Sequence, residues 1–131
     1  MTLLDTTFLI DLMKGKQEAI EKLKQMESEM IPIFVSTPTI FELWTGIKAT
    51  KKPDEEKQKV IDVISSVNNL ELDLESAKAA GEINGILIKR GEMIDPEDCM
   101  IAGIAQTNNE SILTRNTLHF GRIKGIKIET Y

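Results

Sequence analysis

The chain opens with Leu3-Leu4-Asp5-Thr6-Thr7-Phe8-Leu9-Ile10-Asp11, and this stretch decides its fold. The two leucines form a short apolar run that predicts a buried strand. Polar residues interrupt the run at Asp5-Thr6-Thr7, and the apolar residues after them begin a helix that stops at Gly15. A strand that leads through a polar break into a helix is typical of the first unit of an α/β sheet.

The rest of the chain continues this alternation of helices and strands. Thr37 is expected to cap a helix that has Pro38 at its first position. The expected helices are Glu18–Met30, Thr37 to about Ala49, Glu55–Val67, Glu75–Lys89 and Asp95 to about Gln106, and the further strands are Ile33–Val35, Leu70–Leu72, Ile112–Thr114 and Ile126–Ile128. The sequence therefore predicts one α/β domain over residues 1–131, with a central parallel sheet of about four to five strands flanked by helices on both faces.

Composition indicates an ordinary globular protein, with 41% hydrophobic and 28% charged residues. The single cysteine, Cys99, excludes an internal disulfide and favours a reducing, cytoplasmic location. Apolar residues follow Cys99, so we interpret it as a small buried side chain rather than a nucleophile. No signal peptide or membrane span is expected, because no apolar run approaches the roughly 18 residues that a span needs.

The net charge of −5 argues against a protein that holds nucleic acid by bulk electrostatic attraction. It does not exclude an enzyme whose acidic residues bind divalent metal ions, because such ions invert the local field.

Two acids stand where ligands bind in a parallel sheet. Asp5 follows the first strand directly, although it could also cap the helix after it. Glu42 lies inside an apolar run, where Phe41, Trp44 and their apolar neighbours are expected to pack inward. A capping box of Thr39 with Glu42 is the alternative interpretation, but Pro38 argues against it.

A third acid, Asp98, lies in the first turn of the helix that starts at Asp95. Acids are common there because they complement the helix dipole. Thr114 and Asn116 follow the fourth expected strand, and an ordinary polar turn would explain them equally well. The predicted topology, however, brings all of these residues to the carboxyl edge of one sheet.

Carboxylates that meet at one place repel each other unless a cation lies between them. Asp5, Glu42 and Asp98 offer hard oxygen ligands, which suit Mg²⁺ or Mn²⁺. The sequence therefore predicts a metal site at this edge of the sheet.

The same stretches, taken in order, resemble the PIN-domain family over nearly the whole chain. The resemblance rests on Leu3-Leu4-Asp5-Thr6-Thr7-Phe8-Leu9-Ile10-Asp11, Phe41-Glu42-Leu43, Asp95-x-x-Asp98-x-x-Ile101-Ala102-x-x-Ala105, Ile112-Leu113-Thr114-Arg115-Asn116-x-x-x-Phe120 and Ile123-Lys124-Gly125-Ile126. The compact length resembles VapC-type toxins more than the larger eukaryotic PIN nucleases.

This resemblance implies a metal-dependent endoribonuclease, the toxin of a type II toxin–antitoxin pair, with Asp5, Glu42, Asp98 and Asn116 at its catalytic site. Asp5, Asp98 and Glu42 would hold Mg²⁺ or Mn²⁺, and Glu42 could instead orient the attacking water. The chain departs from many members of the family, which have a fourth acid near the position of Asn116. His119 stands close by and could act as a general base, although a surface histidine is the simpler interpretation.

The predicted topology places supporting residues near this edge of the sheet, and the resemblance implies partners. Thr6 and Thr114 would orient the acids, while Arg115, Arg122, Lys14 and Lys16 would position RNA unless they are ordinary surface charges. The expected partners are an RNA substrate, an antitoxin that docks an amphipathic helix, and a second copy of the chain.

Two other functions remain open. The missing fourth acid would suit a degenerate, non-catalytic PIN domain that binds RNA or protein. Asp5 could also be a phosphoryl-accepting nucleophile, as in haloacid-dehalogenase-like enzymes, but that chemistry needs a second Asp at the place of Thr7.

Overall fold

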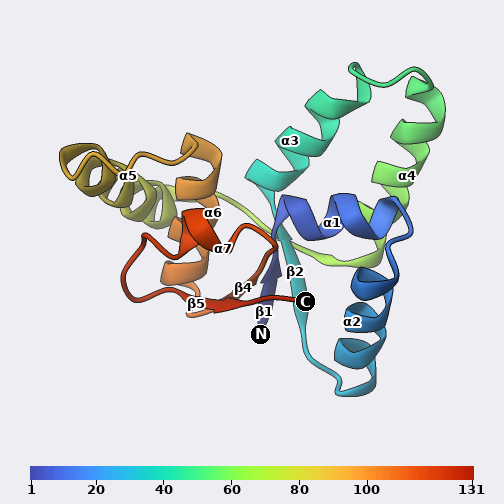
Figure 1. The fold of residues 1–131 in the computed structure, drawn as a ribbon, viewed down its shortest axis with the longest axis horizontal. Coiled ribbons are helices and arrows are strands. Elements are labelled where there is room, and N and C mark those ends of the chain that lie inside the picture. Colours follow the sequence, from blue (N-terminus) through green and yellow to red (C-terminus); the bar gives the residue numbers. More distant parts are fainter.

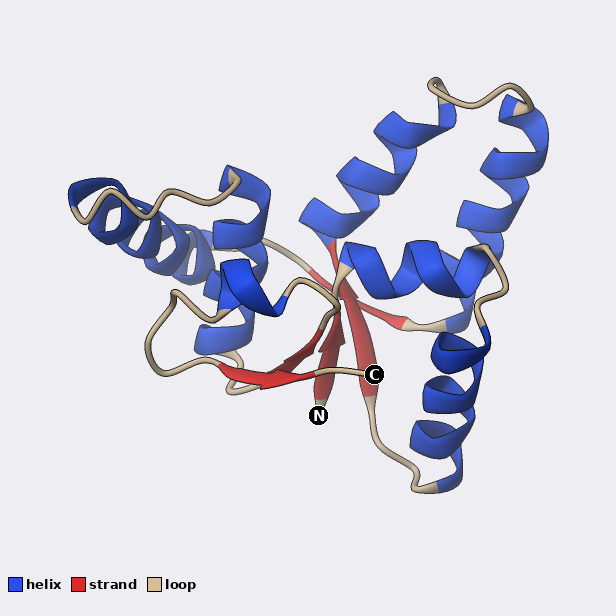
Figure 2. Ribbon diagram, in the orientation of Figure 1, coloured by secondary structure: helices blue, strands red, loops and turns tan.

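The computed structural model describes all 131 residues and contains one five-stranded parallel sheet in the order β3-β2-β1-β4-β5. Figures 1 and 2 show the strands at the centre of the molecule, with helices around them. The elements are β1 (Thr2–Leu4), α1 (Thr6–Met13), α2 (Gln17–Ser28), β2 (Ile33–Ser36), α3 (Thr37–Ile47), α4 (Pro53–Ser66), β3 (Asn68–Leu70), α5 (Leu74–Lys89), α6 (Pro96–Thr107), β4 (Ser111–Leu113), α7 (Thr117–Phe120) and β5 (Lys127–Glu129). The predicted fold class is confirmed.

Each face of the sheet is covered by its own group of helices. Leu3 packs into a core with side chains of α5, α6 and α7, and Leu4 packs into a second core with side chains of α1 to α4. Figure 1 shows these two groups on opposite sides of the sheet. Successive residues of a strand point to opposite faces, so the two adjacent leucines of β1 reach both cores.

Four local predictions are wrong. Strand β3 covers Asn68–Leu70 instead of Leu70–Leu72, because Leu72 lies past the strand and its N–H donates to the Thr37 hydroxyl. The short helix α7 (Thr117–Phe120) was not predicted. The cap of α3 is Ser36, whose hydroxyl accepts from the Thr39 N–H at 3.3 Å, so Thr37 is already helical.

The fourth correction concerns the apolar residues of α3. Leu43 and Ile47 are buried as expected, but Phe41 and Trp44 are 63% and 46% exposed. The Lys57 ammonium lies 5.7 Å from the centre of the Trp44 ring, which is a cation–π contact. Phe41 and Trp44 lie on the side of α3 turned away from the core, so α3 presents aromatic side chains to solvent.

The helix that carries Asp98 is fixed by close packing against α5. A Cβ atom at Gly103 would lie 2.6 Å from the Ser76 carbonyl oxygen, so only glycine permits this approach of α6 to α5. Cys99 is buried on the same helix, and burial raises the pKa of its thiol to about 11, as expected for an inert side chain. None of the helices has the length and apolar character required to span a bilayer.

Candidate active site

The three predicted acids lie at the carboxyl edge of the sheet. Asp5 follows β1 directly and is 1% exposed. Glu42 lies in the second turn of α3, and Asp98 lies in the first turn of α6 and is 8% exposed. We call these residues the acid cluster, because the charges of Asp5 and Asp98 act on Glu42 and the charge of Asp5 acts on Asp98.

One oxygen of the Asp5 carboxylate accepts hydrogen bonds, and the other accepts none. Its Oδ2 accepts hydrogen bonds from the hydroxyls of Thr7 at 2.9 Å and Thr114 at 2.7 Å. Its Oδ1 is buried and has no hydrogen-bond partner in the protein. Asp5 lies at the N-cap position of α1, but its side chain makes no capping hydrogen bond. A buried carboxylate oxygen without a partner is costly, which suggests that it has a ligand.

Glu42 is half-buried and held by a threonine. The Thr6 hydroxyl donates to Glu42 Oε1 at 2.7 Å. The pKa of Glu42 is raised to about 7, mainly by burial and also by the charges of Asp98 and Asp5, against the opposing effect of the Thr6 hydrogen bond. Because Ser36 caps the helix, Glu42 has no capping role.

Asp98 is linked to the loop after β4 through the only histidine. His119 Nδ1 lies 3.2 Å from Asp98 Oδ2 and 2.9 Å from the side-chain nitrogen of Asn116. The pKa of Asp98 is raised to about 6, mainly by burial and also by the charge of Asp5, against the opposing effect of the His119 hydrogen bond. His119 therefore touches the acid cluster and is more than a surface histidine.

Asn116 does not touch a carboxylate with its side chain, but its backbone closes a chain of hydrogen bonds. Its N–H donates to Thr114 Oγ1 at 2.8 Å, and Thr114 Oγ1 donates to Asp5. Thr114 thus connects Asp5 to Asn116, while His119 Nδ1 either donates to Asp98 or accepts from the Asn116 amide, because one ring nitrogen cannot do both. Thr6 and Thr114, the predicted supporting residues, each donate a hydrogen bond to a carboxylate of the acid cluster.

The residues present fit a hard divalent cation by their chemistry. As the side chains stand, no group of three or more acidic, histidine or cysteine side chains closes around one point. Yet Asp5 has a free buried oxygen, and Glu42 and Asp98 have pKa values raised by burial and repulsion. A cation held by these carboxylate oxygens would remove all of these costs at once.

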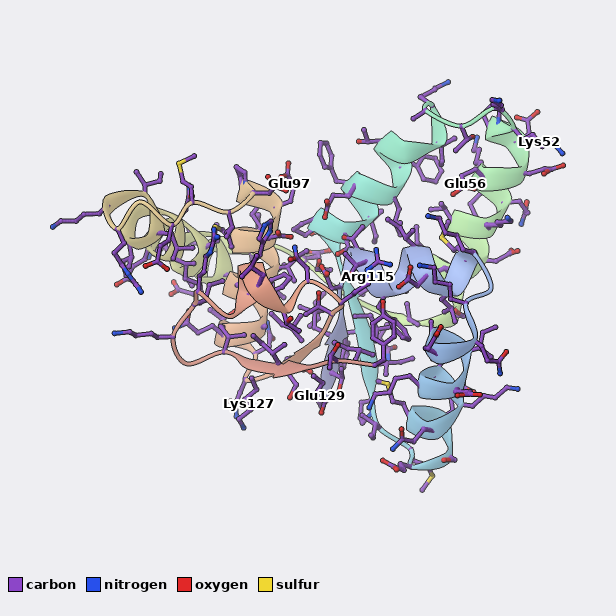
Figure 3. The ribbon with its side chains drawn as sticks, viewed as in Figure 1. Lys52, Glu56, Glu97, Arg115, Lys127 and Glu129 are labelled. Atoms are coloured by element: carbon purple, nitrogen blue, oxygen red, sulfur yellow. The ribbon has the colours of Figure 1, made fainter.

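The predicted RNA-positioning cations have different surroundings. The Arg115 guanidinium contacts both carboxylate oxygens of Asp11, at 2.7 and 2.9 Å, and the Lys16 ammonium lies 3.2 Å from the same carboxylate. Arg122 donates to two main-chain carbonyls of the loop before α6, and Lys14 is exposed at the end of α1. Figure 3 shows Arg115 beside α1.

Sequence reasoning missed a second group of polar residues, the Asp11 cluster, formed by Asp11, Lys16, Arg115 and Tyr131. Asp11 is 1% exposed and also accepts a hydrogen bond from the Tyr131 hydroxyl at 2.6 Å. Burial by itself would raise the pKa of Asp11, but the hydrogen bonds and the two cations outweigh it and lower the pKa. An acid one helical turn after Thr7, inside an apolar run, was the available signal.

Known proteins resemble this chain along nearly its whole length. The PIN domain family model matches residues 2–126. The tRNA(fMet)-specific endonuclease VapC of Salmonella typhimurium is 32% identical over 129 residues, covering 98% of this chain and 96% of the relative. The protein of the same name from Shigella flexneri is 28% identical over 130 residues, with the same coverage.

Solved structures show the same fold. The DNA-bound VapBC complex of Salmonella typhimurium contains a chain that superposes with a TM-score of 0.89 at 31% identity, covering 98% of this chain and 96% of that one. A chain of the VapBC2 complex of Rickettsia felis, bound to a promoter DNA fragment, gives a TM-score of 0.90 at 22% identity, with coverage of 99% and 98%. The family model, the relatives and the fold agree along the chain, which therefore belongs to the PIN-domain family.

Proposed function

We propose that this protein is a divalent-metal-dependent endoribonuclease that hydrolyses RNA phosphodiester bonds. The observation that carries the proposal is the acid cluster, in which Asp5 keeps a buried oxygen without a partner beside two acids of raised pKa. Relatives named as tRNA(fMet)-specific endonucleases support the same activity. Mg²⁺ or Mn²⁺ is the proposed cofactor, because the ligands are carboxylate oxygens.

Each residue of the site has a role that follows from its contacts. Asp5 Oδ1 and the Asp98 carboxylate would hold the cation. When bound, the cation supplies a Lewis acid that acidifies water and offsets negative charge on the scissile phosphate. Glu42, with a pKa of about 7, can join the ligands or orient the water and accept its proton near neutral pH.

The remaining residues hold these groups in place. Thr6 orients Glu42, and Thr114 orients Asp5, each through a hydroxyl hydrogen bond of 2.7 Å. Asn116 is part of the proposed catalytic set through its contacts with Thr114 and His119. Arg115, Arg122, Lys14 and Lys16 are the proposed RNA contacts; Arg115 and Lys16 use part of their donor capacity on Asp11.

A free endoribonuclease would damage its own cell, so an inhibitory partner is part of the proposal. The solved relatives include VapBC toxin–antitoxin complexes. We propose a cytoplasmic protein that pairs with an antitoxin and with a second copy of itself. The exposed aromatic side chains of Phe41 and Trp44 on α3 offer an apolar surface for an antitoxin helix.

The test is cleavage of a mixed RNA panel by the pure protein with Mg²⁺, with Mn²⁺ and with chelator. The parent is compared with Asp5→Asn, which keeps the shape of the side chain and removes its charge. Cleavage that needs both the metal and Asp5 supports the proposal. Intact RNA under all conditions, with folded parent free of antitoxin, contradicts it.

The second candidate function is a non-catalytic PIN domain that binds RNA or protein. It is favoured by Asn116, which stands where many members have a fourth acid, and by the absence of a closed group of three metal-binding side chains. The same RNA panel separates the two, because a binding protein would retain RNA without cutting it. A phosphoryl-transfer role for Asp5 has less support, since Thr7 occupies the place of the second acid and donates to Asp5.

A further inference from the structure

Asp11 contacts side chains from three separate parts of the chain. Its carboxylate contacts Arg115 after β4, Lys16 in the loop between α1 and α2, and Tyr131 after β5. Tyr131 also packs edge-on against Phe8 of α1, with 4.9 Å between ring centres. The Asp11 cluster therefore fixes the end of α1 to the loop that follows β4.

Helix α1 holds Arg115 at two points. The Arg115 N–H donates to the Thr7 hydroxyl at 3.1 Å, and the Arg115 guanidinium contacts Asp11. Thr7 and Asp11 are four residues apart and therefore lie on the same face of the helix. Backbone and side chain of Arg115 are thus both bound to one rigid element, which fixes the turn at residues 114–116.

This turn supplies the Asp5 carboxylate with one of its two hydrogen bonds. Thr114, directly before Arg115, is 0% exposed and donates to Asp5 Oδ2 at 2.7 Å. The Thr7 hydroxyl donates to the same oxygen and lies 3.3 Å from Thr114 Oγ1. With Oδ2 occupied by two hydroxyls, Oδ1 is the oxygen left for a ligand.

We propose that Asp11 is a positioning residue for the reaction: through Arg115 it holds the turn at residues 114–116, so that Thr114 keeps Asp5 oriented with Oδ1 available. The inference rests on the proposed nuclease function, because it gives Asp5 the role of metal ligand. It assigns to Asp11 a task beyond stabilising the fold. Residues that do not touch the metal but orient its ligands commonly affect metal affinity and turnover together.

The test compares Asp11→Asn with Tyr131→Phe in the full chain. Both variants remove a hydrogen bond within the Asp11 cluster, but only the first weakens the hold on Arg115. Four quantities are measured well below the melting temperatures: kcat and KM of RNA cleavage, the Kd for Mn²⁺ by calorimetry, and the rate of amide hydrogen exchange at Arg115.

The proposal predicts that Asp11→Asn lowers kcat and the affinity for Mn²⁺ by about tenfold each, whatever change in KM follows from loosening Arg115 as an RNA contact. Exchange of the Arg115 amide accelerates in the same variant. Tyr131→Phe leaves kcat, Mn²⁺ affinity and Arg115 exchange as in the parent. Should Asp11→Asn fail to fold, Arg115→Gln keeps Asp11 paired with Lys16 and Tyr131, and it must show the same loss of Mn²⁺ affinity.

Other outcomes overturn the proposal. An Asp11→Asn protein that melts earlier but keeps the parent kcat and Mn²⁺ affinity would give Asp11 a purely structural role. A raised KM at constant kcat would assign the cluster to RNA binding instead. A parent that cuts no RNA, yet binds Mn²⁺ more tightly than Asp11→Asn, would contradict the nuclease function and leave the positioning role standing. A parent that neither cuts RNA nor binds Mn²⁺ overturns both.

Discussion

The acid cluster and the Asp11 cluster begin in the same short stretch of chain, and the pKa shifts of their buried acids have opposite signs. In the acid cluster, His119 is the only basic side chain in contact with a carboxylate, and the pKa values of Glu42 and Asp98 rise. In the Asp11 cluster, two cations and a phenol surround one carboxylate, and its pKa falls. A buried acid therefore stabilises the fold only where the chain supplies its partners.

The two ends of α1 therefore belong to sites of different kinds. The first residues of α1 belong to the acid cluster, whose carboxylate charges the protein does not neutralise. The last turn of α1 belongs to the Asp11 cluster, whose carboxylate is neutralised by side chains of the chain itself. Incomplete charge compensation is a common property of functional sites, which accept a cost in stability to bind a ligand. Removing a charge from the acid cluster should therefore leave stability unchanged or raise it, whereas removing the charge of Asp11 should lower stability.

The largest effect is expected for Asp5→Asn, which removes the charge next to the unpartnered oxygen. We expect RNA cleavage to fall roughly a thousandfold, equivalent to about 4 kcal/mol of barrier. Cleavage rates at saturating Mg²⁺ and Mn²⁺ measure the loss, and thermal melting in chelator serves as the control. Asp5→Asn should melt no earlier than the parent, because it relieves repulsion between the carboxylates of the acid cluster. A variant that still cuts RNA and is less stable than the parent would contradict this account.

The next largest effect is expected for the free energy of unfolding of Asp11→Asn. Asn cannot replace a carboxylate between two cations, and we expect a loss of about 2 to 3 kcal/mol, below the range for fully buried pairs because Arg115 and Lys16 are half-exposed. Urea unfolding measures it. The pKa of Asp11 is lowered by folding, so its contribution is present above the unfolded value of 3.8 and is lost as pH falls through the folded value. A difference from the parent that grows on acidification would contradict the pairing.

Whether each cluster could be predicted depends on whether local sequence patterns mark its residues. Asp5 and Asp98 are visible in the sequence, because each stands at the junction of a predicted strand or helix, and parallel topology brings such junctions to one edge. The partners of Asp11 are 104 and 120 residues away, so no local pattern marks them. Only the side-chain contacts of the folded chain reveal that Arg115 is bound to Asp11.

The same reasoning explains the smaller errors of prediction. The cap of α3 could be Ser36 or Thr37 by residue type, and the choice depends on where β2 ends against its neighbours. Phe41 and Trp44 were assigned to the core by hydrophobicity, although the direction of α3 leaves them exposed. Fold class and the acid cluster depend on order along the chain, whereas these details depend on packing.

A third, smaller effect should have the opposite sign from Asp11→Asn. In chelator, Glu42→Gln is expected to stabilise the protein by about 1 to 2 kcal/mol near pH 8, raising Tm by a few degrees. The pKa of Glu42 rises from 4.5 to about 7 on folding, so the parent loses stability as pH increases between these values. The variant lacks this loss, and the two melting curves should converge near pH 4.5.

Metal ions provide the control for this third prediction. Mn²⁺ should raise the Tm of the parent, because it binds the folded state, and should raise that of Glu42→Gln less. Parent and variant with equal Tm in chelator at all pH values would show that Glu42 is not strained by its neighbours. The acid cluster would then differ from the Asp11 cluster in geometry alone.

The smallest effect is expected for Tyr131→Phe, which tests how the Asp11 cluster divides its stability among its members. The variant keeps the ring that packs on Phe8 and removes one hydrogen bond to a charged acceptor, so we expect a loss of about 1 kcal/mol. Burial and Asp11 raise the pKa of the Tyr131 phenol, so the hydroxyl remains a donor at all ordinary pH values. In the background of Asp11→Asn the same substitution should cost less, because the acceptor has lost its charge. Equal losses in both backgrounds, measured by a double-mutant cycle in urea, would show that the contribution of the Tyr131 hydroxyl is independent of the Asp11 charge and that the two cations compensate Asp11 without it.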